Sequence, residues 1–129
     1  MTRTVLFVCE HGAFRSRIAA AYFNAAAPKG WRALSAGRDP QAEVSARLGP
    51  LLAGTAAAEH LENGPPRGVD AVRPDRVIAI DCALDGAERW VTEAKADQAL
   101  RDEIAERTGR LVRELGAGQM PTREPKSRW

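Results

Sequence analysis

The sequence has little cysteine, and this limits what its thiols can do. Of 129 residues only two are cysteines, Cys9 and Cys82, which is too few for a disulfide scaffold. Such a low content suits a reducing compartment, where a thiol is either a small buried hydrophobic group or a reactive one. Each cysteine therefore has to be assigned to one of these two classes.

The sequence also lacks an excess of charge of either sign and any long apolar run. Its formal net charge is +2, and acidic and basic residues are interleaved along most of the chain, which argues against a nucleic-acid partner. No apolar run approaches the roughly 18 residues needed to span a bilayer. The start, MTRTVLFVCEHG, is too short and wrongly flanked for a signal peptide. We expect a cytoplasmic protein with neither nucleic acid nor membrane as a partner.

What the sequence does contain is a regular alternation of strand-like and helix-like segments. Short apolar runs predict strands at 5–8, 31–37, 75–81 and 88–92. Apolar residues at helical spacing predict helices at 16–28, 44–52 and 97–115. Strands separated by helices favour a parallel sheet, and the length suits one domain. We therefore predict a single-domain α/β fold in which a four-stranded parallel sheet carries helices on both faces.

Glycine and proline mark the expected breaks between these segments. Gly49 and Pro50 predict a kink or split in the second helix, and Gly116 predicts the end of the last helix. The Gly- and Pro-rich stretch 63–74 predicts a surface loop. We place the domain at 1–115 and predict that 116–129 is a mobile tail.

The junction between the first predicted strand and the first predicted helix contains the chemistry. Cys9 falls at the end of the strand and Ser16 at the start of the helix, so the residues between them form a loop against a helix N-terminus. Unpaired amides there attract an oxyanion, and Arg15 adds a planar guanidinium. The same positive field favours the thiolate of Cys9, to which the Ser16 hydroxyl can donate. Cys9, Arg15 and Ser16 are therefore candidate catalytic residues, and the predicted oxyanion loop consists of Glu10, His11, Gly12, Ala13, Phe14 and Arg15.

This loop resembles that of the low-molecular-weight protein tyrosine phosphatase superfamily, and the arsenate reductases within it more than the tyrosine phosphatases. The phosphatases tend to read Cys-x-Gly-Asn-x-Cys-Arg-Ser and the arsenate reductases often Cys-x-His-Asn-x-x-Arg-Ser. Here CEHGAFRS has Gly12 in place of the asparagine, a mild exchange because both residues tolerate left-handed backbone. In addition, VIAIDCALD is similar to a segment of actinobacterial arsenate reductases reading roughly Val-Ile-Thr-Met-Gly-Cys-Gly-Asp. The resemblance covers roughly 4–115 and implies a three-layer sandwich.

The sequence departs from this family at the general acid. The resemblance implies an Asp-Pro pair after a tryptophan matching Trp90, and the aspartic acid of that pair protonates the leaving oxygen. The corresponding dipeptide here is Ala94-Lys95. Glu93 is one residue away and is the candidate catalytic replacement, because general acid catalysis needs a carboxyl group that can hold a proton. Asp81 and Asp85 are weaker candidates.

Several of these residues also have ordinary structural explanations. Cys82 follows a buried strand, so it is either a core residue or, as the resemblance implies, a thiol that resolves an adduct on Cys9. His11 either holds loop backbone or touches substrate. The negative charge of Glu10 at the mouth of the loop would repel a dianionic substrate and favour a substrate with a cationic part. Phe14 would narrow the same mouth. We expect packing roles for Tyr22, Trp31 and Trp90, a solvated helix position for His60, and surface positions for Arg17, Arg32 and Arg38.

Three functions are compatible with this sequence. The first is arsenate reduction, in which, as the resemblance implies, Cys9 attacks arsenate and Cys82, a small thiol or a thioredoxin-type reductant resolves the adduct. The second is hydrolysis of phosphomonoesters through a phosphocysteine. The third, from another class, is a non-catalytic oxyanion-binding protein that has lost its general acid. We expect phosphate, arsenate or a phosphomonoester as ligand, no metal or other cofactor, and either a monomer or a homodimer.

Overall fold

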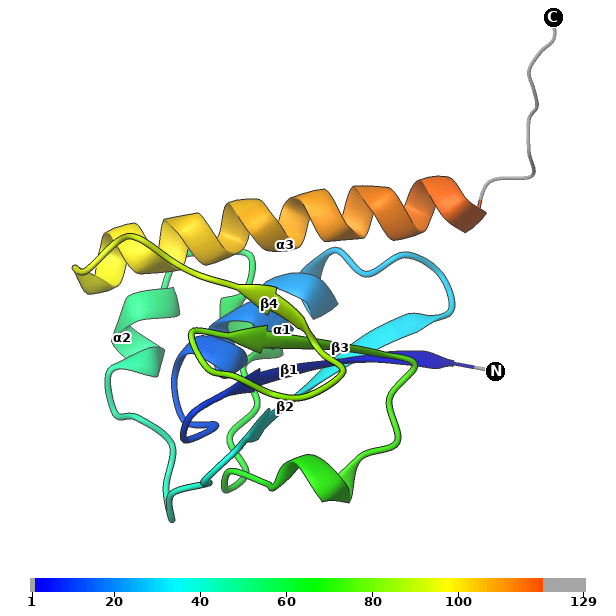
Figure 1. Cartoon of the computed structure of the whole chain (residues 1–129). Coiled ribbons are helices and arrows are strands. Elements are labelled where there is room, and N and C mark those ends of the chain that lie inside the picture. The colour runs from blue at the N-terminus through cyan, green and yellow to red at the C-terminus, as the bar shows by residue number, and fades with distance from the viewer. Residues whose placement is uncertain (1, 120–129) are drawn as a thin grey trace, which may run out of the picture.

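The computed structural model describes residues 2–119, which form a four-stranded sheet with helices packed against it (Figure 1). The strands are β1 (Arg3–Cys9), β2 (Trp31–Gly37), β3 (Arg76–Ile80) and β4 (Glu88–Trp90). The α-helices are α1 (Arg15–Ala25), α2 (Leu48–Leu52) and α3 (Asp97–Gln119), and two short 3-10 helices are η1 (Ala58–His60) and η2 (Val69–Ala71). The predicted α/β fold is confirmed.

The order of the strands places a ligand site at the end of β1. The sheet runs β2-β1-β3-β4, and all three strand pairs are parallel. The chain leaves β1 toward β2 on one side and later returns to β3 on the other side. This reversal makes the carboxyl end of β1 a topological switch point, where α/β proteins bind their ligands. Cys9 is the last residue of β1 and pairs with Gly37, the last residue of β2.

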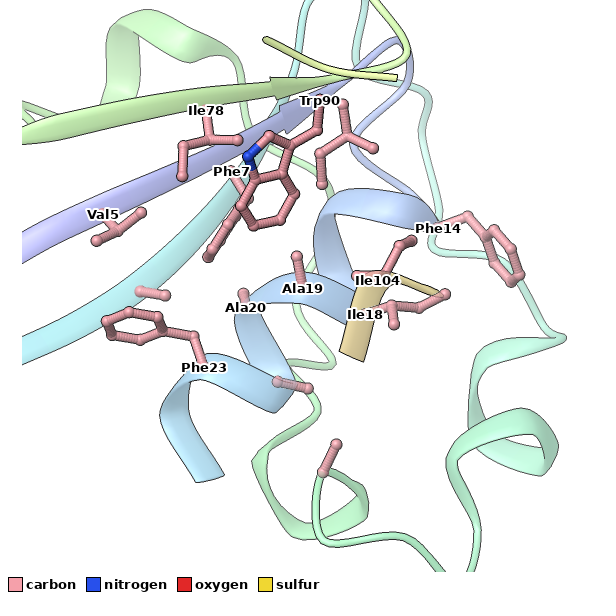
Figure 2. Packing of buried hydrophobic residues seen from close by; sticks show 14 of the residues in the cluster. Val5, Phe7, Phe14, Ile18, Ala19, Ala20, Phe23, Ile78, Trp90 and Ile104 are labelled. Carbon is pink, nitrogen blue, oxygen red and sulfur yellow. The ribbon is translucent and has the colours of Figure 1, made fainter. Parts of the chain in front are cut away.

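The larger core lies between the sheet and the helices α1 and α3 (Figure 2). Alternation along β1 sends Val5 and Phe7 to this face. The Phe7 ring packs against Phe23 of α1 and Trp90 of β4, with ring centroids 6.1 and 5.6 Å apart. The expected packing role of Trp90 is therefore confirmed, and the tryptophan anchors the short edge strand to the core.

The opposite face of the sheet is covered more thinly. Leu6, Val8 and Cys82 form a smaller cluster there, against which Val69 of η2 and Val72 pack. Helices thus lie on both faces, but in the described residues the α-helices lie on one face and only a 3-10 helix on the other. The loop predicted at 63–74 contains that 3-10 helix.

Two predicted helix boundaries are wrong. The second helix is only α2, beginning at Leu48, and it contains Gly49 and Pro50 without a split. A proline is tolerated in the first turn of a helix, where its missing N–H would have no partner. Gly116 does not end α3, which continues to Gln119, because one glycine costs a helix only about 1 kcal/mol. The rest of the predicted tail, 120–129, lies outside the described residues. No helix in the described part of the chain is long and apolar enough to cross a membrane.

Candidate active site

The loop between β1 and α1 encloses a pocket at the carboxyl edge of the sheet. The pocket has a volume of about 250 Å³. All predicted loop residues line it except Gly12, and other segments contribute Gln41, Ser45, Arg47, Ile80 and Asp81. The structure therefore brings the predicted nucleophile and the predicted oxyanion clamp into one cavity.

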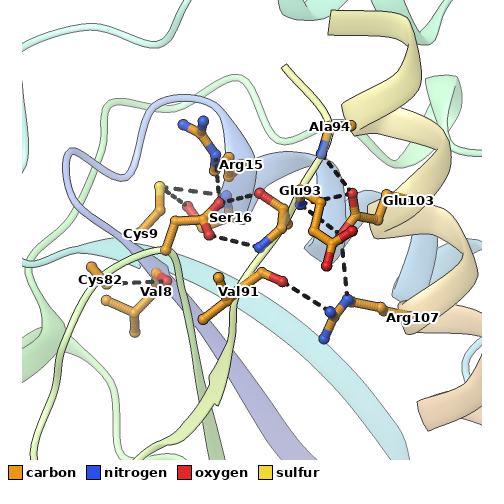
Figure 3. A network of polar contacts seen from close by, with 12 residues as sticks. Val8, Cys9, Arg15, Ser16, Cys82, Val91, Glu93, Ala94, Glu103 and Arg107 are labelled. Carbon is orange, nitrogen blue, oxygen red and sulfur yellow. Dashed lines mark hydrogen bonds and ion pairs between the residues drawn. The ribbon is translucent and has the colours of Figure 1, made fainter. Parts of the chain in front are cut away.

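The Cys9 sulfur lies against the first turn of α1 (Figure 3). Its side chain is only 6% exposed. The Cys9 Sγ atom lies 3.1 Å from the Ser16 hydroxyl and accepts a hydrogen bond from the Ser16 backbone N–H at 3.4 Å. Ser16 is itself buried. A hydroxyl, a backbone amide and a helix N-terminus thus meet at one sulfur, which is the kind of environment in which nucleophilic cysteines are found.

The Arg15 guanidinium faces a carboxylate across the pocket. Its Nε atom lies 2.9 Å from Asp81 Oδ2, close enough for an ion pair although the two groups are not aligned as a hydrogen bond. Asp81 Oδ1 accepts a hydrogen bond from the Thr92 backbone N–H at 2.8 Å, and Oδ2 accepts one from the Thr92 hydroxyl. The Arg15 side chain is 41% exposed, so N–H groups of its fork remain accessible to an oxyanion.

Two glycines press the loop backbone against the end of β2. Gly12 has a φ of +66°, and a Cβ atom there would lie 2.6 Å from the Gly37 backbone nitrogen. A Cβ atom on Gly37 would lie 2.5 Å from the Gly12 nitrogen. The left-handed conformation expected for Gly12 is confirmed, and the structure adds a requirement that the sequence did not reveal: neither position has room for a side chain.

The comparison with solved structures identifies the family of this pocket and sheet. An arsenate reductase from Archaeoglobus fulgidus DSM 4304 is 33% identical, with a TM-score of 0.67, over 84% of this chain and 98% of that one. The chain belongs to the low-molecular-weight protein tyrosine phosphatase superfamily. It is accordingly a cysteine-dependent oxyanion enzyme of this superfamily.

Two further solved structures also resemble this chain. A thioredoxin-dependent arsenate reductase from Corynebacterium glutamicum is 26% identical, with a TM-score of 0.73, over 92% of this chain and 64% of that one. A low-molecular-weight protein tyrosine phosphatase from T. tengcongensis shares the fold at 19% identity and a TM-score of 0.66, over 88% of this chain and 99% of that one. No family model and no curated protein matches the chain.

The expected surface position of Arg17 is wrong. The residue lies in α1 and is only 1% exposed. Its Nε donates to the Gly12 carbonyl at 3.2 Å and one terminal nitrogen donates to the Glu62 carbonyl at 2.6 Å. Burial lowers the Arg17 pKa, which the nearby Glu62 carboxylate partly offsets. Arg17 therefore holds the backbone of the loop between β1 and α1 through the Gly12 carbonyl, and its second partner is too distant in sequence for the helical pattern to reveal.

The structure does not bring Glu93 to the pocket. The backbone N–H groups of Glu93 and Ala94 donate to the Glu103 carboxylate of α3 at 3.1 and 3.0 Å (Figure 3). Arg107 of the same helix donates to the Val91 carbonyl at 2.9 Å. The segment after β4 is therefore tied to α3, and the Glu93 side chain is exposed. Asp85, the other weak candidate, is also exposed and does not line the pocket.

Charged groups shape the mouth of the pocket. The Arg47 guanidinium lies 4.2 Å from the centre of the Phe14 ring, which is therefore covered. Glu10 is paired with Arg38 at 3.2 Å, with both side chains exposed. The Nδ1 atom of His11 lies 3.1 Å from the Asp39 carbonyl, so the histidine holds backbone and lines the pocket as well.

Arg32, Arg38 and His60 are exposed, as expected. In the described residues, no group of His, Cys, Asp and Glu side chains is arranged to hold a metal ion.

Cys82 lies on the other face of the sheet from Cys9. It is 5% exposed in the smaller core cluster, where its thiol donates to the Val8 carbonyl at 3.7 Å. Val8 belongs to that cluster too, and because neighbouring side chains on a strand alternate, Cys9 points to the opposite face. Both thiols are free. A disulfide between them would require the segment after β3 to move.

We expect iodoacetamide to alkylate Cys9 at lower pH than Cys82. The thiolate is the reactive form, and burial raises the pKa of the Cys82 thiol, so this thiol keeps its proton to more alkaline pH. Mass spectrometry of the two cysteine peptides after labelling across a pH series measures the difference. In denatured protein the two should label alike, and equal labelling in folded protein would contradict the assignment of Cys9 as the reactive thiol.

Proposed function

We propose that this protein is an arsenate reductase in which Cys9 is the nucleophile and Arg15, with the loop amides, binds the oxyanion. One observation carries the proposal: the Cys9 sulfur, 3.1 Å from Ser16 Oγ, shares its pocket with Arg15. The 33% identity to an arsenate reductase along most of both chains supports arsenate as the substrate.

In the first step the Cys9 thiolate attacks arsenic. A sulfur–arsenic bond forms, an arsenic–oxygen bond breaks, and the oxygen leaves as water once it has been protonated. The Ser16 hydroxyl and amide hold the sulfur, and free N–H groups of Arg15 hold the remaining oxygens as a planar fork. Arsenic keeps its oxidation state in this step.

Reduction follows when a second thiolate attacks the Cys9 sulfur. A disulfide forms, the electron pair of the sulfur–arsenic bond passes to arsenic, and arsenite leaves. We assign this thiolate to an external small thiol or thioredoxin-type protein, because Cys82 is buried on the opposite face. A further thiol then reduces the disulfide and restores Cys9.

The proposal is tested by assaying the purified protein with arsenate and a panel of thiols, and in parallel with a chromogenic aryl phosphate. The expected result is arsenate-dependent oxidation of at least one thiol and slow or absent hydrolysis of the ester. Turnover of the aryl phosphate alone would replace the proposal with phosphomonoester hydrolysis. Turnover of neither, with oxyanion binding retained, would leave a binding protein.

A further inference from the structure

We propose that Asp81 is the proton donor of this active site, in place of the carboxyl group that is absent at position 94. This inference rests on the proposed function, since it names the group that protonates the oxygen leaving arsenic. Of the pocket-lining residues only Glu10 and Asp81 carry carboxyl groups. Glu10 is half exposed and paired with Arg38, whereas Asp81 is less exposed and lies beside Arg15, the predicted oxyanion clamp.

The backbone at Asp81 is held in an unusual conformation. Asp81 directly follows β3 and has a φ of +55°, the only positive φ among the described non-glycine residues. Residues other than glycine adopt this region uncommonly, although Asp does so more readily than most, and such conformations persist where the surrounding structure enforces them, often at functional sites. Here the Asp81 N–H donates to the Trp90 carbonyl at 2.9 Å, which fixes the turn that directs the side chain into the pocket.

The Asp81 carboxylate is also fixed at its oxygens. Thr92 donates to both of them, through its backbone N–H and its hydroxyl, and Arg15 Nε lies beside Oδ2. The segment that carries Thr92 is in turn bound to Glu103 and Arg107 of α3. The segment after β4 thus does not supply the acid itself; through Thr92 it positions Asp81, which directly follows β3.

Binding of an oxyanion changes the charge balance around this carboxylate. In the free protein Asp81 is the negative partner of Arg15. An oxyanion on the remaining N–H groups of Arg15 brings a second negative charge beside Asp81, and two adjacent anions favour protonation of one of them. The other ionisable groups that line the pocket are Cys9, Glu10, His11, Arg15 and Arg47.

A proton on Asp81 then has a chemical use. The protonated carboxyl donates a hydrogen bond to an oxygen of the bound ion, and as the arsenic–oxygen bond breaks the proton moves to that oxygen, which leaves as water. The carboxylate that remains returns to its partners Arg15 and Thr92. No electron is transferred in this step, and the external thiol supplies the reducing electrons later.

The first test measures proton uptake on anion binding. Sulfate is the probe because it does not titrate near neutral pH, and Cys9→Ser is the background because it removes the titrating thiol. Calorimetry in buffers of different ionisation enthalpy should show that Asp81 contributes about one proton per sulfate bound, so that affinity rises by up to about tenfold for each unit that pH falls. In the double variant Cys9→Ser/Asp81→Asn the proton uptake contributed by Asp81 should vanish, while any proton uptake by His11 should persist. Equal proton uptake in the two proteins would overturn the proposal.

The second test measures turnover in the wild-type background. General acid catalysis contributes roughly a hundredfold to ten-thousandfold, so Asp81→Asn should slow arsenate reduction by about a hundredfold or more and flatten the decline of the rate toward alkaline pH. Asp81→Gly, which suits the left-handed backbone, should do the same if the asparagine variant folds poorly. Asp85→Asn, which changes an exposed acid four residues away, is the matched control and should keep the wild-type rate.

The outcomes separate this inference from the function on which it rests. If wild type reduces arsenate and both Asp81 variants retain its rate, or if Glu93→Gln causes the loss instead, the role of Asp81 is refuted and the function stands. If wild type reduces no arsenate but sulfate-linked proton uptake depends on Asp81, the function is refuted and Asp81 remains the proton-holding group of the site.

Discussion

Cys9→Ser is expected to lower the rate of arsenate reduction by at least about a thousandfold. A serine hydroxyl at this position remains protonated near neutral pH, so the attack on arsenic loses its nucleophile. Serine also cannot form the disulfide through which arsenic receives electrons, so the second step is lost with the first. The rate of thiol oxidation with and without arsenate measures the effect.

Two controls make this result specific. Cys9→Ser should still bind sulfate, because the loop amides and Arg15 are unchanged and the replacement is small enough for the buried site. Cys82→Ser should keep the wild-type rate with a small thiol, because Cys82 lies on the opposite face of the sheet. Substantial turnover by Cys9→Ser would contradict the assignment of the nucleophile, and a loss in Cys82→Ser would make Cys82 the resolving thiol.

Gly12→Ala is expected to destabilise the fold by about 3 kcal/mol and to abolish oxyanion binding. The left-handed backbone costs a side chain about 1–2 kcal/mol, and overpacking against a backbone atom 2.6 Å away costs about 1–3 kcal/mol. To relieve the contact the loop must move away from β2, which removes its amides from the anion. Urea unfolding and sulfate calorimetry measure the two effects.

Gly116→Ala is the matched control for this substitution. A Cβ atom on Gly116 in α3 meets no atom within 4 Å, so the alanine should stabilise the protein slightly, by about 0.5–1 kcal/mol, and leave sulfate binding unchanged. A Gly12→Ala protein as stable as wild type, with normal sulfate affinity, would show that the loop does not depend on its contact with β2.

The fold and the strand–loop–helix junction that brings Cys9 and Arg15 into one pocket could be predicted because their signals are local. An apolar run that ends at Cys9, with Arg15 and Ser16 opening a helix, specifies a strand, a loop and a helix N-terminus within a few residues of each other. The α/β alternation is local in the same sense. The ends of helices are harder to predict from single residues. Gly116 predicts the end of the last helix, yet α3 continues past it, because the packing of α3 against α1 stabilises the helix by more than one glycine destabilises it.

What the sequence did not reveal depends on partners that are distant in sequence. The burial of Arg17 depends on the Glu62 carbonyl, 45 residues away, which no helical pattern reveals. The contact of Gly12 with Gly37 depends on the register of β1 and β2. Asp81 was ranked below Glu93 because closeness in sequence to the missing acid was the only guide. In the fold β3 lies beside β1, which brings Asp81 to Arg15, while Glu93 has turned toward α3.

Protection of Cys9 by an oxyanion tests most directly whether this loop is an anion site built around a nucleophile. The measurement is the rate at which iodoacetamide alkylates Cys9 as arsenate is added, in wild type and in Arg15→Lys. Arsenate should slow the reaction saturably in wild type. Lysine keeps the charge but not the planar fork, so half-protection in the variant should need about ten to more than a hundred times as much arsenate, corresponding to a loss of about 1.5–3 kcal/mol. A rate of Cys9 alkylation that does not change with arsenate in wild type would contradict the assignment.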